Sequence, residues 1–298
     1  MANILISGLI NTETSVRVRR FPVEYYPIDY PFFGVNTAVS GVAYNLALAL
    51  KTLGESITLT TMTGEDFSAA YIREELSSYG ISTGEIRCVL QQTPASVVLY
   101  DETGRRQVYC DLKDIQEAAY DFREELVENA DLVIACNINF NRPLLKLAKE
   151  KGKIIATDVH VLRDIYDGYN RAFMEAADIL FLSDEGIEGD YRDFLGELAA
   201  VYEPEILVLG RGANGASVYI KAENRLYDLP AVNAGAVVNT VGAGDALFSS
   251  FLHWYLKGRH PVECLRYAQY FAAAKIRCSG ASRGFVTEAE LERLMENV

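Results

Sequence analysis

Residues 40–62 read SGVAYNLALALKTLGESITLTTM, the pattern of a helix that is followed directly by a strand. The apolar residues of the first half recur at helical spacing, at Val42, Leu46, Leu50 and Leu53. Gly54 is typical of a helix end, because glycine adopts the left-handed conformation without strain. Residues 57–62 are a short run with the composition of a strand. The segment therefore predicts one α/β unit.

The same alternation continues through most of the chain. Short apolar runs that suit buried strands occur at residues 4–9, 132–135, 154–157, 179–182 and 206–209. A helical stretch precedes each of the last four runs, which is the order expected of βαβ units around a covered parallel sheet. The sequence predicts a doubly wound, mostly parallel α/β fold with helices on both faces, as a single domain over residues 1–298.

Two stretches break this alternation. Residues 21–33 hold a dense aromatic run with three prolines, which excludes a regular helix and a central strand. Residues 96–100 and 106–111 flank a turn sequence and predict a hairpin. We expect a small β appendage from about residues 12–36 and 94–114. Its aromatic loop is a lid, a partner-facing surface or an extended arm that packs down on the protein.

Composition excludes several classes of protein. Among 298 residues, 41 are acidic and 28 basic, a formal net charge of −13 that argues against a nucleic-acid partner. No apolar run approaches a membrane span, and residues 1–8 lack the basic flank of a signal peptide. The five cysteines form no Cys-x-x-Cys pair, which disfavours disulfides and zinc and suits the cytoplasm.

Residues 239–245, NTVGAGD, lead into an apolar helix predicted over 245–256. Gly242, Ala243 and Gly244 allow the backbone to pass close to a ligand, and the helix start adds positive potential. This arrangement suits an anion hole for a transferring phosphoryl group. Asp245 is then placed to accept a hydroxyl proton as a general base. The alternative on these residues alone is a glycine-rich loop with an N-capping Asp245.

Residues 239–245 closely resemble the Asp-Thr-x-Gly-Ala-Gly-Asp signature of the ribokinase-like (PfkB) carbohydrate kinases. Three other segments resemble family signatures in the same order and spacing: residues 8–13, residues 40–66 and residues 208–216. The match runs from about residue 3 to residue 290. The resemblance implies ATP-dependent transfer of the γ-phosphate to a hydroxyl of a small carbohydrate, ribose-like or fructose-like. It also implies that the β appendage is a lid and a possible homodimer interface.

The resemblance assigns roles to individual residues. Asp245 looks like the catalytic base, with Gly242, Ala243 and Gly244 as the anion hole. Substrate contacts are expected from Asn11, Glu13, Gly41, Asn45 and Asn239, and Asn137 follows a strand end on the crevice side. Nucleotide contacts are expected from Gly210, Gly212, Gly215 and Thr240.

Several positions depart from the family pattern. Asn239 and Glu13 stand where the family commonly has Asp, and Ser40 replaces the first glycine of a Gly-Gly pair. The family's Asn-x-x-Glu motif, which organises magnesium through water in relatives, would read Ser183 and Gly186 here. Either Asp184 or Glu185 takes over the metal role, or the metal site is rearranged. ATP and Mg²⁺ are the implied cofactors, and a K⁺ requirement stays open.

Two alternatives remain for the activity. A nucleoside or pseudouridine kinase of the same family would need an apolar wall for the base, which the aromatic run at residues 21–33 could supply. A catalytically weakened sugar or nucleotide sensor is the second alternative, motivated by Ser183 and Gly186. The three histidines, His160, His253 and His260, are scattered and are interpreted as structural or surface residues.

Overall fold

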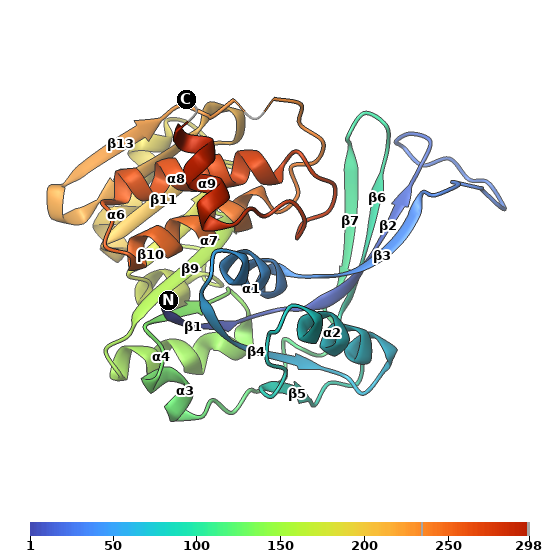
Figure 1. Cartoon of the computed structure of the whole chain (residues 1–298), viewed down its shortest axis with the longest axis horizontal. Coiled ribbons are helices and arrows are strands. Elements are labelled where there is room, and N and C mark those ends of the chain that lie inside the picture. Colours follow the sequence, from blue (N-terminus) through green and yellow to red (C-terminus); the bar gives the residue numbers. More distant parts are fainter. Residues whose placement is uncertain (234, 297–298) are drawn as a thin grey trace.

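The computed structural model describes residues 1–233 and 235–296. Nine strands form the large sheet in the order β13-β12-β11-β10-β9-β8-β1-β4-β5 (Figure 1). They are β1 (Asn3–Ser7), β4 (Ser56–Thr63), β5 (Ile86–Cys88), β8 (Leu132–Ala135), β9 (Ile154–Val161), β10 (Ile179–Ser183), β11 (Ile206–Gly210), β12 (Ala216–Ile220) and β13 (Arg225–Leu229). All pairs from β5 to β11 are parallel, whereas β12 and β13 pair antiparallel at one edge.

Helices cover both faces of this sheet. One face carries α1 (Val42–Thr52), α2 (Phe67–Ser78), α7 (Ala243–Leu256), α8 (Pro261–Lys275) and α9 (Glu288–Glu296). The other carries α3 (Glu124–Glu128), α4 (Arg142–Glu150), α5 (Arg171–Ala176) and α6 (Tyr191–Tyr202). Along β1, Ile4 and Ile6 enter the first core while Leu5 enters the second, because successive side chains of a strand point to opposite faces. The predicted doubly wound α/β fold is confirmed.

One predicted helix boundary was wrong. Helix α7 begins at Ala243, two residues before the predicted start, because Gly242 is left-handed (φ 79°) and only the residues after it are helical. Helix α8 begins at Pro261, whose fixed φ suits a first helical position, and ends at Lys275. Within the described part of the chain, no helix is long and apolar enough to cross a membrane.

The four-stranded small sheet has the order β3-β2-β6-β7 and projects away from the large sheet (Figure 1). It consists of β2 (Asn11–Arg17), β3 (Val35–Ser40), β6 (Ala95–Tyr100) and β7 (Arg106–Asp111). The parallel pairing of β2 with β6 joins two stretches that are distant in sequence. The first stretch continues to Ser40, beyond the expected boundary at residue 36, because β3 pairs with β2 along its whole length.

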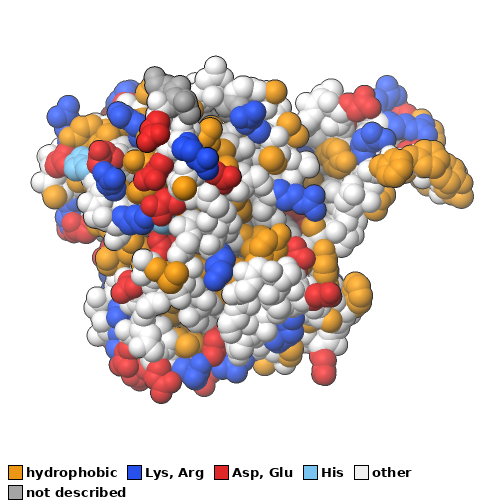
Figure 2. All heavy atoms as spheres, viewed as in Figure 1, with side chains coloured by type: hydrophobic (Ala, Val, Ile, Leu, Met, Phe, Trp, Pro, Cys, Tyr) orange, Lys and Arg blue, Asp and Glu red, His pale blue; other side chains and the backbone are white. Residues whose placement is uncertain are grey.

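The aromatic segment between β2 and β3 is solvent-exposed. Tyr25, Tyr30, Phe32 and Phe33 are 88%, 70%, 76% and 101% exposed. Apolar side chains gather at the outer end of this projection, at the far right of Figure 2. The arm therefore does not pack down on the protein, and its aromatic side chains form no wall at the large sheet of the same chain. Of the alternatives for this loop, a lid tip or a partner-facing surface remains.

Candidate active site

The candidate residues gather where the parallel strands end. Strand β1 lies between β4 and β8, so the connections leave it in opposite directions along the sheet, which is the point where open α/β sheets form a binding crevice. Asn11 follows β1, Asn137 follows β8 and Asp184 follows β10. Helix α7 brings the glycine-rich segment to this region from the C-terminal part of the chain.

The glycine-rich loop is held against the chain segment that follows α8. The N–H groups of Val238 and Asn239 both donate to the Ile276 carbonyl, at 2.8 and 3.1 Å. A Cβ atom on Gly242 would lie 2.3 Å from the Ala281 oxygen, so only glycine fits at this left-handed position. Asn239 itself accepts from the Val241 N–H at 2.8 Å, which fixes the turn.

Three backbone N–H groups of the loop have no hydrogen-bond acceptor among the described residues. No hydrogen bond from the amides of Gly242, Gly244 or Asp245 is found within residues 1–233 and 235–296. They lie at the start of α7, where the helix dipole also favours negative charge. The predicted anion hole therefore has free donors, supplied by Gly242, Gly244 and the backbone of Asp245. The Ala243 amide is instead bonded to the Thr240 carbonyl at 3.1 Å.

Asp245 is half-buried, and its carboxylate accepts a hydrogen bond from Asn45 Nδ2 at 2.7 Å. No side chain caps the start of α7, and Gly242 occupies the N-cap position, so the capping interpretation of Asp245 is wrong. Burial raises the pKa of Asp245 to about 6, opposed by the bond from Asn45 and by the nearby charge of His160. A carboxylate with this pKa is ionised at neutral pH and more basic than an exposed one.

Charged groups surround Asp245. His160 lies beside Asp158, with Nδ1 3.4 Å from Oδ2, and the charge of Asp158 raises the pKa of His160 to about 9. Both act electrostatically on Asp245, as does Lys275. The Cys136 thiol is buried next to these carboxylates, and desolvation raises its pKa. His160, interpreted from the sequence as a structural or surface residue, therefore lies close enough to Asp245 for its charge to affect that carboxylate.

The sugar-side candidates Asn11, Glu13 and Asn45 line the junction between the two sheets. Asn11 Nδ2 donates to Ser96 Oγ at 3.0 Å, and Ser40 Oγ donates to Glu13 Oε2 at 3.2 Å. Asn11 and Asn45 are each 4% exposed, and the Oδ1 atom of each has no hydrogen-bond partner among the described residues. Buried acceptors without donors are costly, so both atoms are suited to receive hydroxyl protons from a ligand.

Other predicted substrate residues are differently engaged. The Asn137 amide donates to Asn170 Oδ1 at 3.0 Å, at the start of α5, and the structure gives it no contact with Asp245. The Asn239 side-chain oxygen accepts from the Val241 N–H within the glycine-rich loop. Gly41 has φ 109° and precedes α1, where its carbonyl accepts from the Asn45 N–H at 3.0 Å. Gly41 thus fixes the backbone of Asn45 through the first hydrogen bond of the helix.

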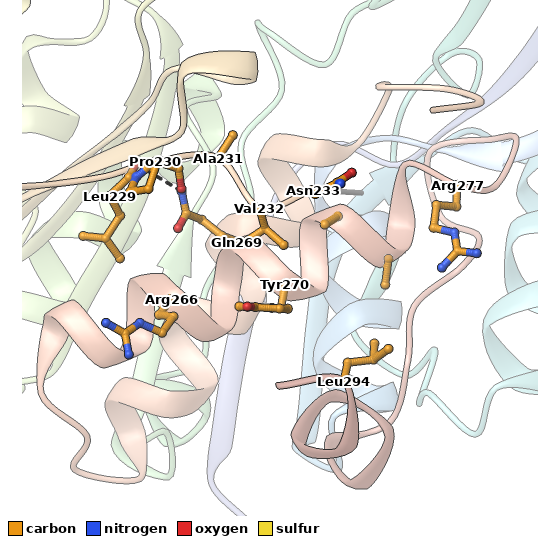
Figure 3. A pocket seen from close by; sticks show the side chains of 12 residues that line it. Leu229, Pro230, Ala231, Val232, Asn233, Arg266, Gln269, Tyr270, Arg277 and Leu294 are labelled. Atoms are coloured by element: carbon orange, nitrogen blue, oxygen red, sulfur yellow. Dashed lines mark hydrogen bonds between the residues drawn. The ribbon is translucent and has the colours of Figure 1, made fainter. Parts of the chain in front are cut away.

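A cavity of about 510 Å³ lies between α8 and the loop that follows β13 (Figure 3). Gln269 projects from the helix and donates to the Leu229 and Pro230 carbonyls at 3.4 and 3.1 Å. The remaining lining is largely apolar, with arginines at both ends: Ala231, Val232, Asn233, Arg266, Tyr270, Ala273, Ala274, Arg277 and Leu294.

Of the predicted nucleotide residues, Gly215 packs against the loop that lines this cavity. A Cβ atom on Gly215 would lie 2.1 Å from the Leu229 oxygen, so this glycine permits the close approach of the loop that lines the cavity. Gly210 ends β11, and Gly212 opens a short 3₁₀ turn, Gly212–Asn214. Thr240 is exposed in the glycine-rich loop. Arg277 adjoins Ile276, whose carbonyl anchors that loop, so the cavity leads toward the anion hole.

The candidate metal residues lie just beyond β10. Asp184 is half-buried and Glu185 exposed, and neither carboxylate forms an ion pair with any described residue. The described residues contain no cluster of three or more metal-ligating side chains. Two carboxylates can hold Mg²⁺ when water and phosphate complete its oxygen shell, so this donor set is compatible with the ion.

Comparison with known proteins decides the family. The model of the pfkB family of carbohydrate kinases matches residues 1–288. The chain belongs to this family. It is an ATP-dependent carbohydrate kinase, as the sequence predicts.

Relatives of this carbohydrate kinase cover its whole length. It is 25% identical to the ATP-dependent ribose-1-phosphate kinase of Halopiger xanaduensis over 304 residues, 99% of each chain. Its fold resembles that of the microbiome-derived acarbose kinase Mak1, with a TM-score of 0.88, 24% identity and 99% of each chain covered. It also resembles Arabidopsis thaliana ribokinase solved with ribose and ATP, with a TM-score of 0.84, 20% identity and 99% of each chain covered. The ribokinase-like fold is confirmed.

Sequence reasoning missed parts of the kinase site that depend on burial. Lys275 is 0% exposed, and its ammonium donates to the Val241 carbonyl. A lysine in the last turn of a helix normally lies in solvent, so its position gave no sign of this contact. The cavity lining on α8 was also missed, because its helical period resembles that of any core helix. His160 was identifiable from its place at a strand end beside Asp158.

Proposed function

We propose that this kinase phosphorylates a hydroxyl of a small free sugar, ribose-like or fructose-like, with Asp245 as the general base. The observation that carries the proposal is the 2.7 Å bond from Asn45 to Asp245, which orients one carboxylate oxygen and leaves the other for a substrate. Next to it lies the unpaired Oδ1 of Asn45, so one residue both positions the base and can accept from a sugar hydroxyl.

In this mechanism, Asp245 accepts the proton of the attacking hydroxyl as the oxygen bonds to the γ-phosphorus and the bond to ADP breaks. The free amides of Gly242, Gly244 and Asp245 receive the negative charge of the transferring group. The raised pKa of Asp245, about 6, increases its basicity while it stays ionised above that pH. His160, protonated because its pKa is about 9, adds positive potential beside the base.

Sugar recognition is assigned to the junction between the sheets. Asn11 Oδ1 and Asn45 Oδ1 accept from two hydroxyls, and Glu13 offers a carboxylate on the neighbouring strand position. The small sheet is proposed to act as a lid whose closure excludes water and so limits ATP hydrolysis. The exposed aromatic segment between β2 and β3 is proposed to face a second copy of the chain, giving a homodimer.

The nucleotide is assigned to the cavity along α8. Its apolar middle suits a purine base, and Arg277 at the end nearest the glycine-rich loop suits the phosphates. Asp184 and Glu185 would hold Mg²⁺, which screens the charge of the phosphates when bound. The five cysteines are free, which agrees with a cytoplasmic location.

The test is ATP turnover by the wild-type protein on a panel of pentoses, ketohexoses, ribose-1-phosphate and nucleosides. We expect turnover on a free sugar, and a loss of at least about 1000-fold in kcat for Asp245→Asn, since that variant cannot accept a proton. Asp178→Asn, which alters a carboxylate that accepts from the Ile155 N–H and has no assigned role in the site, is the control for a general effect on folding.

The panel also separates the alternatives. Turnover on nucleosides only would make this a nucleoside kinase. Sugar binding in a thermal shift without any turnover would identify the protein as a sensor. A folded Asp245→Asn variant with a near-wild-type rate would refute the mechanism.

A further inference from the structure

Lys275 is a buried cation that the mechanism above does not use. It is the last residue of α8, and its side chain is completely shielded from solvent. A lysine is almost never fully buried without a compensating partner, because its ammonium loses hydration. Desolvation lowers the pKa of Lys275 to about 8, opposed by the negative charge of Asp245. The fold retains this costly charge beside the catalytic carboxylate.

The partner of the ammonium is a backbone carbonyl of the glycine-rich loop. Lys275 Nζ donates to the Val241 oxygen, in the residue directly before Gly242. No other hydrogen bond from this ammonium is found among the described residues. The Val241 N–H is held by Asn239, so both polar groups of this peptide are fixed by side chains. The loop is therefore clamped at the point where it turns into α7.

The clamp also affects the anion hole. In an α-helix the N–H of a residue bonds to the carbonyl four residues earlier, so Val241 is the natural acceptor for the Asp245 amide. The described structure contains no such bond, and Lys275 donates to this carbonyl instead. The Asp245 amide is consequently free to act as a phosphate donor, next to the carboxylate that acts as the base.

We propose that Lys275 is a positioning residue for phosphoryl transfer: its ammonium fixes the Val241 carbonyl and supplies the positive charge that a free monovalent cation would otherwise bring to this loop. The inference rests on the proposed function of Asp245 and extends it. It also answers the K⁺ requirement that the family resemblance leaves open. A K⁺ ion bound at this loop would need backbone oxygens as ligands, and Lys275 already occupies the Val241 oxygen. The residues present therefore do not fit a K⁺ requirement.

The charges that act on these two groups come from α7, α8, β7, β9 and the segment after α8. Asp245 of α7, Cys278 after α8 and Arg106 of β7 act on Lys275. His160 and Asp158 of β9, together with Lys275, act on Asp245. The active form needs Asp245 ionised and Lys275 protonated. The rate of the wild-type kinase should rise as the pH passes the Asp245 pKa of about 6, and fall as it passes the Lys275 pKa of about 8.

The experiment compares pH profiles of kcat/KM for wild type, Lys275→Met and Lys275→Arg, with Lys51→Met as a matched control on an exposed helix end. The pH profile of the wild type should have an acid limb, where Asp245 loses its proton and the rate rises, and an alkaline limb, where Lys275 loses its proton and the rate falls. Lys275→Met should lower the rate about 100-fold and abolish the alkaline limb. It should also move the acid limb to higher pH, because removing a cation raises the pKa of Asp245. Lys275→Arg should keep the acid limb and lose the alkaline limb, because arginine stays protonated. A merely structural lysine would lower the rate without moving either limb.

A second measurement covers variants that fail to fold. Wild-type turnover should be unchanged when K⁺ is replaced by tetramethylammonium, and Lys275→Ala should regain activity with K⁺ or ethylammonium. A K⁺ requirement of the wild type, or unchanged pH limbs in folded Lys275→Met, would overturn the role of Lys275 alone. A wild-type protein that transfers no phosphate to any acceptor would instead refute the proposed function.

Discussion

Replacing Asn45 with Ala tests the contact on which the mechanism depends. Asn45 Nδ2 donates to the Asp245 carboxylate at 2.7 Å and lowers the pKa of that group against the effect of burial. A hydrogen bond to a charged group contributes ~1.5–3 kcal/mol, and ~1.4 kcal/mol corresponds to one pKa unit. The substitution should therefore raise the pKa of Asp245 by about one to two units. Asp245 would then lose its proton only at higher pH.

The assay is ADP release at saturating sugar and ATP between pH 5 and pH 9. With a wild-type pKa of about 6 and a variant pKa roughly 1.5 units higher, the ionised fraction of Asp245 at pH 6.5 falls from roughly three quarters to roughly one tenth. We expect roughly an eightfold lower kcat at pH 6.5 and a smaller difference toward pH 8. The KM for the sugar should rise as well, because Asn45 Oδ1 is lost.

The control is Asn129→Ala, at the exposed end of α3, which contributes no residue to the site. Its acid limb should coincide with that of the wild type. An acid limb that stays in place in folded Asn45→Ala, with kcat within twofold of wild type, would refute the assigned role of Asn45.

Two further predictions concern the nucleotide and the metal. Ala274→Phe places a ring in the cavity along α8. The KM for ATP should therefore rise about tenfold or more, while the KM for the sugar stays near that of the wild type. Equal effects on both KM values would contradict the assignment of the cavity to the nucleotide. Asp184→Asn removes one of the two unpaired carboxylates beyond β10, so the Mg²⁺ concentration for half-maximal turnover should rise severalfold, whereas Asp193→Asn on exposed α6 should leave it unchanged. An unchanged Mg²⁺ dependence in Asp184→Asn would place the ion elsewhere.

The sequence by itself determined the fold and the outline of the site. Short apolar strands that alternate with amphipathic helices specify a parallel sheet covered by helices. In that arrangement both faces of the strands and the apolar side of each helix are buried. Gly242, Gly244 and Asp245 indicated the anion hole and the base. The structure requires glycine at 242, where the backbone is left-handed and lies against Ala281. The apolar patterns and the glycine-rich motif each lie within a short stretch of sequence, so they can be recognised without the tertiary structure.

Only the tertiary structure decided which polar groups meet and how much solvent reaches them. Asn45 and Asp245 are 200 residues apart in sequence, and Lys275 and Val241 are 34 apart. Nothing in either stretch predicts that Asp245 bonds to Asn45 instead of capping its helix, or that Lys275 is buried. Burial and long-range contact set the charges of the site, because desolvation and nearby ions shift pKa values, and both depend on the assembled fold.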